Sequence, residues 1–184
     1  MKEDQERWNI RFSKRPLLNP NTPGFIESHY RQLIPGSVLD VASGDGAASL
    51  FLAAKGFTVT ATDVSDVALE RLVFFAKKLK LEASTCLLDL DQPDGASHLG
   101  TFNNIVITHF KPEPNHWPFL VSLLRIGGKL MVSTFNQQHH IQNNFSQRFC
   151  LNKNELINIS DELKLEHHES VIRNSCYMDD YLFI

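Results

Sequence analysis

The chain has 184 residues, of which 42% are hydrophobic and 21% charged, a size and composition suited to one globular domain, residues 1–184, with a substantial core. A formal net charge of −3 gives no positive field for nucleic acid or an anionic membrane, so we expect a small-molecule partner. Three scattered cysteines without a CxxC pair, a charged start and no membrane-length apolar run favour a reduced, cytoplasmic setting.

The first 36 residues are predicted to form a helical segment ahead of the main fold. Residues 6–12 suit a short helix that places Trp8 and Phe12 on one side. A Pro/Asn/Gly-rich loop over residues 15–24 follows, and then a helix over residues 25–33. We expect this segment to act as a lid on the remainder of the chain.

From residue 37 onward, short apolar runs rich in β-branched residues alternate with longer helical patterns. This alternation predicts βαβ units and a parallel sheet. The predicted strands span residues 37–41, 57–62, 82–88, 104–108 and 129–135, and the predicted helices span 47–55, 66–79 and 115–124, the last closing at Gly127-Gly128. Ser65 and Asp66 are candidate N-caps for the helix that runs to Leu79.

The last third of the sequence departs from this alternation. A helix is predicted over residues 154–163, and strands over 164–171 and 176–183. A short turn at Arg173-Asn174 leaves no room for a helix between the two strands, so they should form an antiparallel hairpin at a sheet edge.

The most informative run is Val38-Leu39-Asp40-Val41-Ala42-Ser43-Gly44-Asp45-Gly46, a buried strand that breaks into a glycine turn and then begins a helix. Gly44 and Gly46 allow close approach of a ligand, and the helix start offers unpaired N–H groups. Asp63 ends the second strand, where a carboxylate can accept hydrogen bonds from both hydroxyls of a ribose. The pattern predicts a nucleoside-containing cofactor.

Three details distinguish this pattern from a dinucleotide site, although a nicotinamide-dependent oxidoreductase remains an alternative. Asp40, just before the loop, would repel a pyrophosphate but attract an α-amino group, directly or through water. Ser49 replaces the third glycine of GxGxxG. Asp89 follows the third strand, where a carboxylate can accept a hydrogen bond from an adenine amino group.

These residues resemble a known family. The stretch from Val38 to Asp63 resembles motif I and the acidic post-I motif of class I S-adenosylmethionine-dependent methyltransferases, and Asp89-Leu90 resembles their adenine-binding motif. Residues 124–130 are similar to the late turn and fifth strand of that family. Trp8-Asn9-Ile10-Arg11-Phe12 resembles the W-x-x-R-[YF] opening of small tellurite-resistance-like and thiopurine-like members.

The resemblance implies an α/β fold, a Rossmann-like three-layer sandwich with strand order 3-2-1-4-5-7-6 and strand 7 antiparallel. It implies S-adenosylmethionine as cofactor, with the glycine turn at its methionine and ribose portion, Asp63 on the ribose and Asp89 with the backbone of Leu90 on the adenine. Trp8 is expected to cover the sulfonium, and Arg11 to meet the methionine carboxylate. The predicted cofactor-binding residues are Trp8, Arg11, Asp40, Ala42, Ser43, Gly44, Gly46, Asp63, Val64, Asp89, Leu90 and Thr108.

The acceptor should meet the cofactor where the fourth strand ends, at Thr108-His109-Phe110. His109 is the candidate catalytic base, and a soft anionic acceptor would need no base. The chain lacks the N/D-P-P-Y/F/W motif of nucleic-acid amine methylation, so a small-molecule acceptor is expected. No metal site is predicted, because the adjacent pairs His139-His140 and His167-His168 point apart on a strand. A non-catalytic cofactor-binding or regulatory domain is the alternative from another class.

Overall fold

A computed structural model describes residues 2–96 and 99–184. Its N-terminal segment contains α1 (Lys2–Ser13), α2 (Gly24–His29) and the short 3-10 helix η1 (Tyr30–Gln32). The helix predicted over 6–12 therefore begins earlier in the structure, at Lys2, and the helix predicted over 25–33 ends as the 3-10 helix η1. Pro35-Gly36 then leads into the first strand, where Gly36 has a φ of +136°.

A single seven-stranded sheet has the order β3-β2-β1-β4-β5-β7-β6, which confirms the predicted topology. Only β7 runs against its neighbours β5 and β6. The strands are β1 (Ser37–Val41), β2 (Thr58–Asp63), β3 (Ser84–Leu87), β4 (Phe102–Thr108), β5 (Leu124–Phe135), β6 (Leu165–Arg173) and β7 (Cys176–Phe183). β1, the third strand across the sheet, pairs in parallel with β2 on one side and β4 on the other. The strand order therefore reverses between β1 and β4, and ligands of open α/β sheets bind at the carboxyl ends of the strands at such a point.

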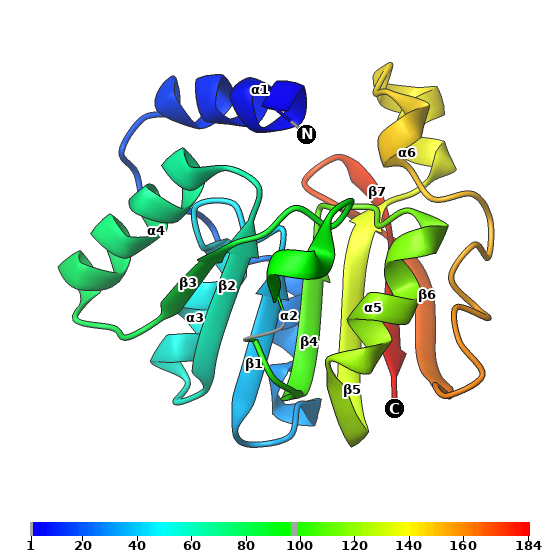
Figure 1. The fold of residues 1–184 in the computed structure, drawn as a ribbon. Coiled ribbons are helices and arrows are strands. Elements are labelled where there is room, and N and C mark those ends of the chain that lie inside the picture. Colours follow the sequence, from blue (N-terminus) through cyan, green and yellow to red (C-terminus); the bar gives the residue numbers. More distant parts are fainter. Residues whose placement is uncertain (1, 97–98) are drawn as a thin grey trace.

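Helices cover the two faces of the sheet. The helices α2, α3 (Ala47–Ala54) and α4 (Asp66–Leu79) pack on one face, and α5 (Trp117–Ser122), after the 3-10 helix η3 (Pro114–His116), packs on the other (Figure 1). β1 shows the division: Val38 belongs to the α2 and α3 side, whereas Leu39 and Val41 belong to the α5 side. Both faces are thus apolar, as expected for a parallel strand buried on both sides.

The edge hairpin of β6 and β7 is antiparallel as predicted, but its turn lies one residue later. Asn174 and Ser175 form a two-residue loop in which both φ angles are positive, +49° and +63°. Two successive positive φ angles define the turn whose twist matches that of the flanking strands. The pairing Arg173↔Cys176 therefore closes the hairpin.

The predicted helix over residues 154–163 is wrong. Leu156, Ile159 and Leu163 follow a helical spacing, but the segment forms successive turns with bonds such as Ile157 N–H to Asn154 carbonyl at 3.2 Å. Asn154 has a φ of +62°, which interrupts a right-handed helix. The ion pair between Lys111 Nζ and Glu155 Oε1, at 2.9 Å, fixes this segment instead.

Two further elements differ from their predictions. The helix expected to close at Gly127-Gly128 ends at Ser122, and both glycines lie within β5. This strand begins at Leu124, because Leu124 pairs with Phe102 before a bulge in the ladder. The helix α6 (Gln137–Asn143) was not predicted. Between β3 and β4 the described residues form only the 3-10 helix η2 (Pro93–Ala96).

Two helices lie at the carboxyl end of the parallel strands. α1 lies across the ends of β1 and β2, and α6 follows the end of β5 on the same side of the molecule (Figure 1). Within the described residues, no helix combines the length and apolarity required for a membrane span.

Candidate functional site

The glycine turn after β1 is held in a conformation that only glycine adopts easily at two positions. Gly44 and Gly46 have φ angles of +56° and +93°, and Ala42 has +53°. A Cβ on Gly46 would lie 2.6 Å from Leu72 Cγ, so α4 packs directly against the turn. Ser43 is fixed by its N–H bond to the Thr62 carbonyl at 2.9 Å. The turn is therefore rigid before any ligand arrives.

Asp63, at the end of β2, joins the glycine turn to the start of α4. One carboxylate oxygen accepts the Gly44 N–H at 2.8 Å and the other accepts the Ser65 N–H at 2.8 Å. Burial raises the pKa of Asp63, opposed by backbone bonds from Ser65, Gly44 and Val64. Because a carboxylate has about four lone-pair sites, Asp63 keeps capacity to accept from a ligand hydroxyl group.

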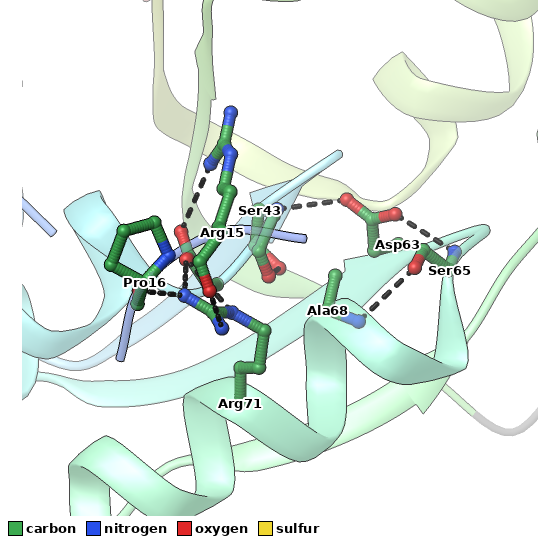
Figure 2. Close-up of polar contacts among 9 residues, drawn as sticks. Arg15, Pro16, Ser43, Asp63, Ser65, Ala68 and Arg71 are labelled. Atoms are coloured by element: carbon green, nitrogen blue, oxygen red, sulfur yellow. Dashed lines mark hydrogen bonds and ion pairs between the residues drawn. The ribbon is translucent and has the colours of Figure 1, made fainter. Parts of the chain in front are cut away.

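Ser65, the residue before the start of α4, caps this helix as predicted: its hydroxyl accepts the Ala68 N–H at 3.1 Å. Figure 2 shows this cap beside Asp63. The same hydroxyl donates to Asn9 Oδ1 at 2.6 Å, and Asn9 Nδ2 donates to Asp66 at 2.6 Å. Asn9 therefore fastens α1 to the start of α4.

A buried ion pair lies beneath the turn and was not predicted. Arg71 Nη2 lies 3.0 Å from Asp45 Oδ2, and both side chains are less than a tenth exposed. The same guanidinium donates to the backbone carbonyls of Arg15 and Pro16 at 3.0 and 2.8 Å (Figure 2). Asp45 thus links the glycine turn, α4 and the loop that follows α1.

Asp40 is fully buried within β1, below the turn. Its Oδ2 accepts the Ser49 hydroxyl at 2.6 Å, while Oδ1 has no hydrogen-bond partner among the described residues. Burial raises the pKa of Asp40 to about 7, with a smaller contribution from the negative charge of Asp63. Ser49, at the position of a third glycine in dinucleotide sites, is therefore a partner of this acid.

The residues predicted for adenine lie beyond β3. Asp89 is half-buried and two residues past the strand, and its Oδ1 accepts the Asp91 N–H at 3.0 Å. This bond belongs to a local turn, which is a common role of Asp. Leu90 is half-buried and packs against the α5-side core.

The aromatic residues of α1 divide between the turn and the surface. Phe12 is buried, and its Cζ lies 3.1 Å from the position of a Cβ on Gly44. Trp8 is half-buried, 6.0 Å from Phe12 between ring centroids, and the exposed Arg11 places its guanidinium 5.0 Å from the Trp8 ring. Arg11 is thus directed toward Trp8.

The end of β4 carries Thr108 and His109. Thr108 is buried, whereas His109 is exposed and has a φ of +56°. Desolvation by the surrounding chain, and then the positive charge of Arg15, lower the pKa of His109. Its imidazole is therefore neutral at pH 7 and able to accept a proton.

An aromatic group beside His109 was missed in the sequence. The Phe135 ring lies 5.5 Å from His109, 4.5 Å from His139 in a stacked pair, and 4.9 Å from Phe145. Phe149 continues the group 6.0 Å from Phe145 and lies under the Arg7 guanidinium of α1 at 5.9 Å. A helix cap at Asn136, whose side chain accepts from Gln138 and His139, was the available signal for α6.

The fold, the glycine turn with its acids, and the family comparison agree on one class. The chain has the Rossmann-like fold of S-adenosylmethionine-dependent methyltransferases and is an enzyme of this class. It belongs to the tellurite resistance protein TehB family, whose model matches residues 12–158. No curated protein matches the sequence.

Three solved structures illustrate the likeness in fold. One, solved for the conversion of a disulfide bond into a thioacetal group during echinomycin biosynthesis, has a TM-score of 0.80 and 17% identity over 97% of this chain and 90% of the other. TehB from Haemophilus influenzae has a TM-score of 0.73 and 19% identity over 96% of this chain and 66% of that one. Magnesium protoporphyrin IX methyltransferase from Synechocystis PCC 6803, with bound S-adenosylmethionine, has a TM-score of 0.68 and 14% identity over 99% of this chain and 95% of that one.

Proposed function

We propose that this enzyme binds S-adenosylmethionine at the glycine turn and transfers its methyl group to a small-molecule acceptor beside His109. The observation that carries the proposal is the bond from Gly44 N–H to Asp63 Oδ2, at 2.8 Å. It brings a ribose-accepting carboxylate to the edge of a turn that favours close backbone contact. The fold neighbours with bound S-adenosylmethionine or its product support the same cofactor.

The acids of the site suit the two ends of this cofactor. Asp40 Oδ1 is a buried acceptor without a partner among the described residues, so a bound ammonium group, directly or through one water, would supply the missing donor. Asp63 would hold the ribose hydroxyls through its remaining lone pairs. Ala42, Ser43, Gly46 and Val64 would line the turn with backbone, and Thr108 would close it from β4.

The adenine would lie toward Asp89 and Leu90. Asp89 Oδ1 is engaged by the Asp91 N–H, which leaves Oδ2 to accept from the adenine amino group. Leu90, packed against the apolar core at this edge, would contact the ring. Arg11 and Trp8 on α1 would cover the methionine portion, which requires Arg11 to leave the face of the Trp8 ring.

The cofactor supplies an electrophilic methyl group on a sulfonium. The protein must therefore orient the acceptor and exclude water. The aromatic rings of Phe135, His139 and Phe145 offer an apolar wall on which a flat or soft acceptor can rest. His109, neutral at pH 7, would accept the proton of a protonated acceptor, and a thiolate or another soft anion would need no such transfer.

A turnover assay tests the proposal. The chain is incubated with S-adenosylmethionine and a panel of thiol, metalloid, phenol and amine acceptors, and S-adenosylhomocysteine is measured. We expect acceptor-dependent product with at least one class, reduced in His109→Asn only for acceptors that must lose a proton. Binding of S-adenosylhomocysteine without turnover on any acceptor would favour a regulatory domain. A thermal shift by NADH and none by S-adenosylhomocysteine would favour an oxidoreductase.

A further inference from the structure

Three side chains that can bind a metal meet on the edge of the sheet, far from the residues discussed so far. One ligand atom each of His29, His167 and Glu169 lies within 4.8 Å of the other two. All three residues are half-exposed. The sequence pairs His139-His140 and His167-His168 gave no such prediction, because His29 is distant along the chain.

The fold explains the meeting. His167 and Glu169 are two apart on β6, so both face the same side of the sheet. His167 pairs with Leu182 of the α2-side core, and Glu169 pairs with Asp180. The last residue of α2 is His29, and α2 is pinned to the same side by the fully buried Phe25 and Ile26.

The hydrogen bonding of the two imidazoles leaves metal-binding lone pairs available. His29 Nδ1 lies 3.1 Å from the Phe25 carbonyl, which only accepts, so this nitrogen carries the proton and Nε2 carries the lone pair. Metal-ligating histidines commonly donate their other N–H to a backbone carbonyl in this way. His167 Nε2 is buried and has no hydrogen-bond partner among the described residues.

The local charge favours a cation. Glu169 Oε1 lies 3.5 Å from His167 Nε2 and 3.8 Å from Arg173 Nη2. The guanidinium of Arg173 makes its shorter contact, 2.6 Å, with Asp180 Oδ2. One guanidinium therefore lies between two carboxylates, and its shorter contact with Asp180 leaves the Glu169 carboxylate only loosely paired.

We propose that His29, His167 and Glu169 bind a divalent transition ion of the zinc type, which ties α2 to the edge strand β6. Two imidazoles and one carboxylate with a free fourth position suit tetrahedral Zn²⁺. With bonds of about 2.1 Å, tetrahedral ligands lie roughly 3.4 Å apart. The ligand atoms here are at most 4.8 Å apart, so no separation needs to shorten by more than about 1.4 Å.

This site is distinct from the proposed methyl-transfer site. Three strand pairings separate Thr108 from Glu169: Thr108 pairs with Ser133, Ser133 with Asp180, and Asp180 with Glu169. Adjacent strands lie about 4.8 Å apart, so the ion would sit about 14 Å across the sheet from the end of β4. Its role would be to fasten the N-terminal segment to the sheet, without contact to the acceptor.

Calorimetric titration of untagged, metal-stripped protein with Zn²⁺ tests the proposal. We expect one equivalent bound by the wild type, and at least tenfold weaker binding by His29→Ala, His167→Ala and Glu169→Gln. His168→Asn is the matched control, because this histidine is next along β6 but stacks on Tyr181 on the other face, 4.2 Å between centroids. His140→Asn on α6 is a second control if His168→Asn does not fold.

Two further readouts complete the test. Co²⁺ in place of Zn²⁺ should give the visible absorption of a four-coordinate site in the wild type and in His168→Asn, but not in His167→Ala. Zn²⁺ should raise the Tm of the wild type more than that of Glu169→Gln, while S-adenosylhomocysteine affinity is the same in both. Equal Zn²⁺ affinity of the wild type and the three variants, or no binding by the wild type, would overturn the proposal.

Discussion

The two sides of the carboxyl edge of this sheet are built from different chemistry. Around β1 and β2 the acidic side chains are buried and held by polar bonds: Asp63 by backbone N–H groups, Asp40 by the Ser49 hydroxyl and Asp45 by the Arg71 guanidinium. Around β4 and β5 the exposed His109 and the half-buried Phe135 meet through ring contacts alone. Fixed polar bonds suit the amino, ribose and adenine groups that a cofactor presents in every turnover, whereas an aromatic wall suits a flat or soft acceptor. The following variants test this division.

The largest expected effect is on the polar side. Asp45→Ala removes the partner of the buried Arg71, and a buried charge left without its counter-ion costs about 3 to 5 kcal/mol. Asp4→Ala is the matched control, because the Asp4–Arg7 pair has the same chemistry with both side chains more than two-fifths exposed. The free energy of unfolding of the Asp4→Ala variant should differ from that of the wild type by about 0.5 kcal/mol or less. Urea denaturation of both variants measures the contrast, and similar losses would contradict it.

The buried acid of β1 should make stability depend on pH. The pKa of Asp40 is about 7 in the folded chain against its ordinary 3.8, so the folded state keeps a proton that the unfolded state has lost. Stability therefore falls as pH rises from about 4 to about 7, by roughly 1.4 kcal/mol per pH unit, and is level above the folded pKa. Asp40→Asn should lack this component. If the stability difference between wild type and variant is the same at pH 5 and pH 7, the assignment fails.

A smaller effect is expected on cofactor affinity at Asp63. Asp63→Ala removes a carboxylate that would accept both ribose hydroxyls, at a cost of about 1 to 3 kcal/mol in binding free energy, or roughly 5- to 150-fold in Kd. Calorimetry with S-adenosylhomocysteine measures the change. Unchanged affinity in a folded Asp63→Ala variant would remove this residue from the site.

The smallest effect concerns the aromatic side and should appear in acceptor kinetics alone. Phe135→Leu removes the ring on which the acceptor would rest while keeping an apolar side chain, and an aromatic contact with the acceptor is worth about 1 kcal/mol. KM for the acceptor should rise roughly fivefold to tenfold, with S-adenosylhomocysteine affinity unchanged. An equal loss of affinity for the acceptor and for S-adenosylhomocysteine would show that the polar side and the aromatic side of the site are not separate.

The sequence was sufficient for the parts of the molecule whose signals are local. β1 has its predicted bounds, and alternation and the short turn predicted the parallel sheet and its edge hairpin, whereas the strand order was implied by the family resemblance. The helix α6 was missed because Gln137–Asn143 contains one apolar residue, Ile141, and that residue is 60% exposed, so no amphipathic pattern exists. The helix predicted over 154–163 had the apolar spacing, but its backbone forms successive turns, and Asn154 at its start adopts a positive φ.

The same reasoning applies to the site. The glycine turn and Asp63 were predicted because each is a local consequence of a strand that ends and a helix that begins. Three features were not predicted: the Arg71–Asp45 pair, the aromatic group at Phe135 and the His29 cluster. Each contains at least one pair of residues that lie 26 or more positions apart in the sequence. A single sequence carries no signal for such contacts, because they depend on how the layers pack.

Titration of the wild-type chain with S-adenosylhomocysteine tests the central claim most directly, since everything on the polar side is assigned to that ligand. The account predicts one binding site per chain with micromolar affinity, and no heat from NADH under the same conditions. The absence of binding at millimolar S-adenosylhomocysteine by the folded wild type would contradict it.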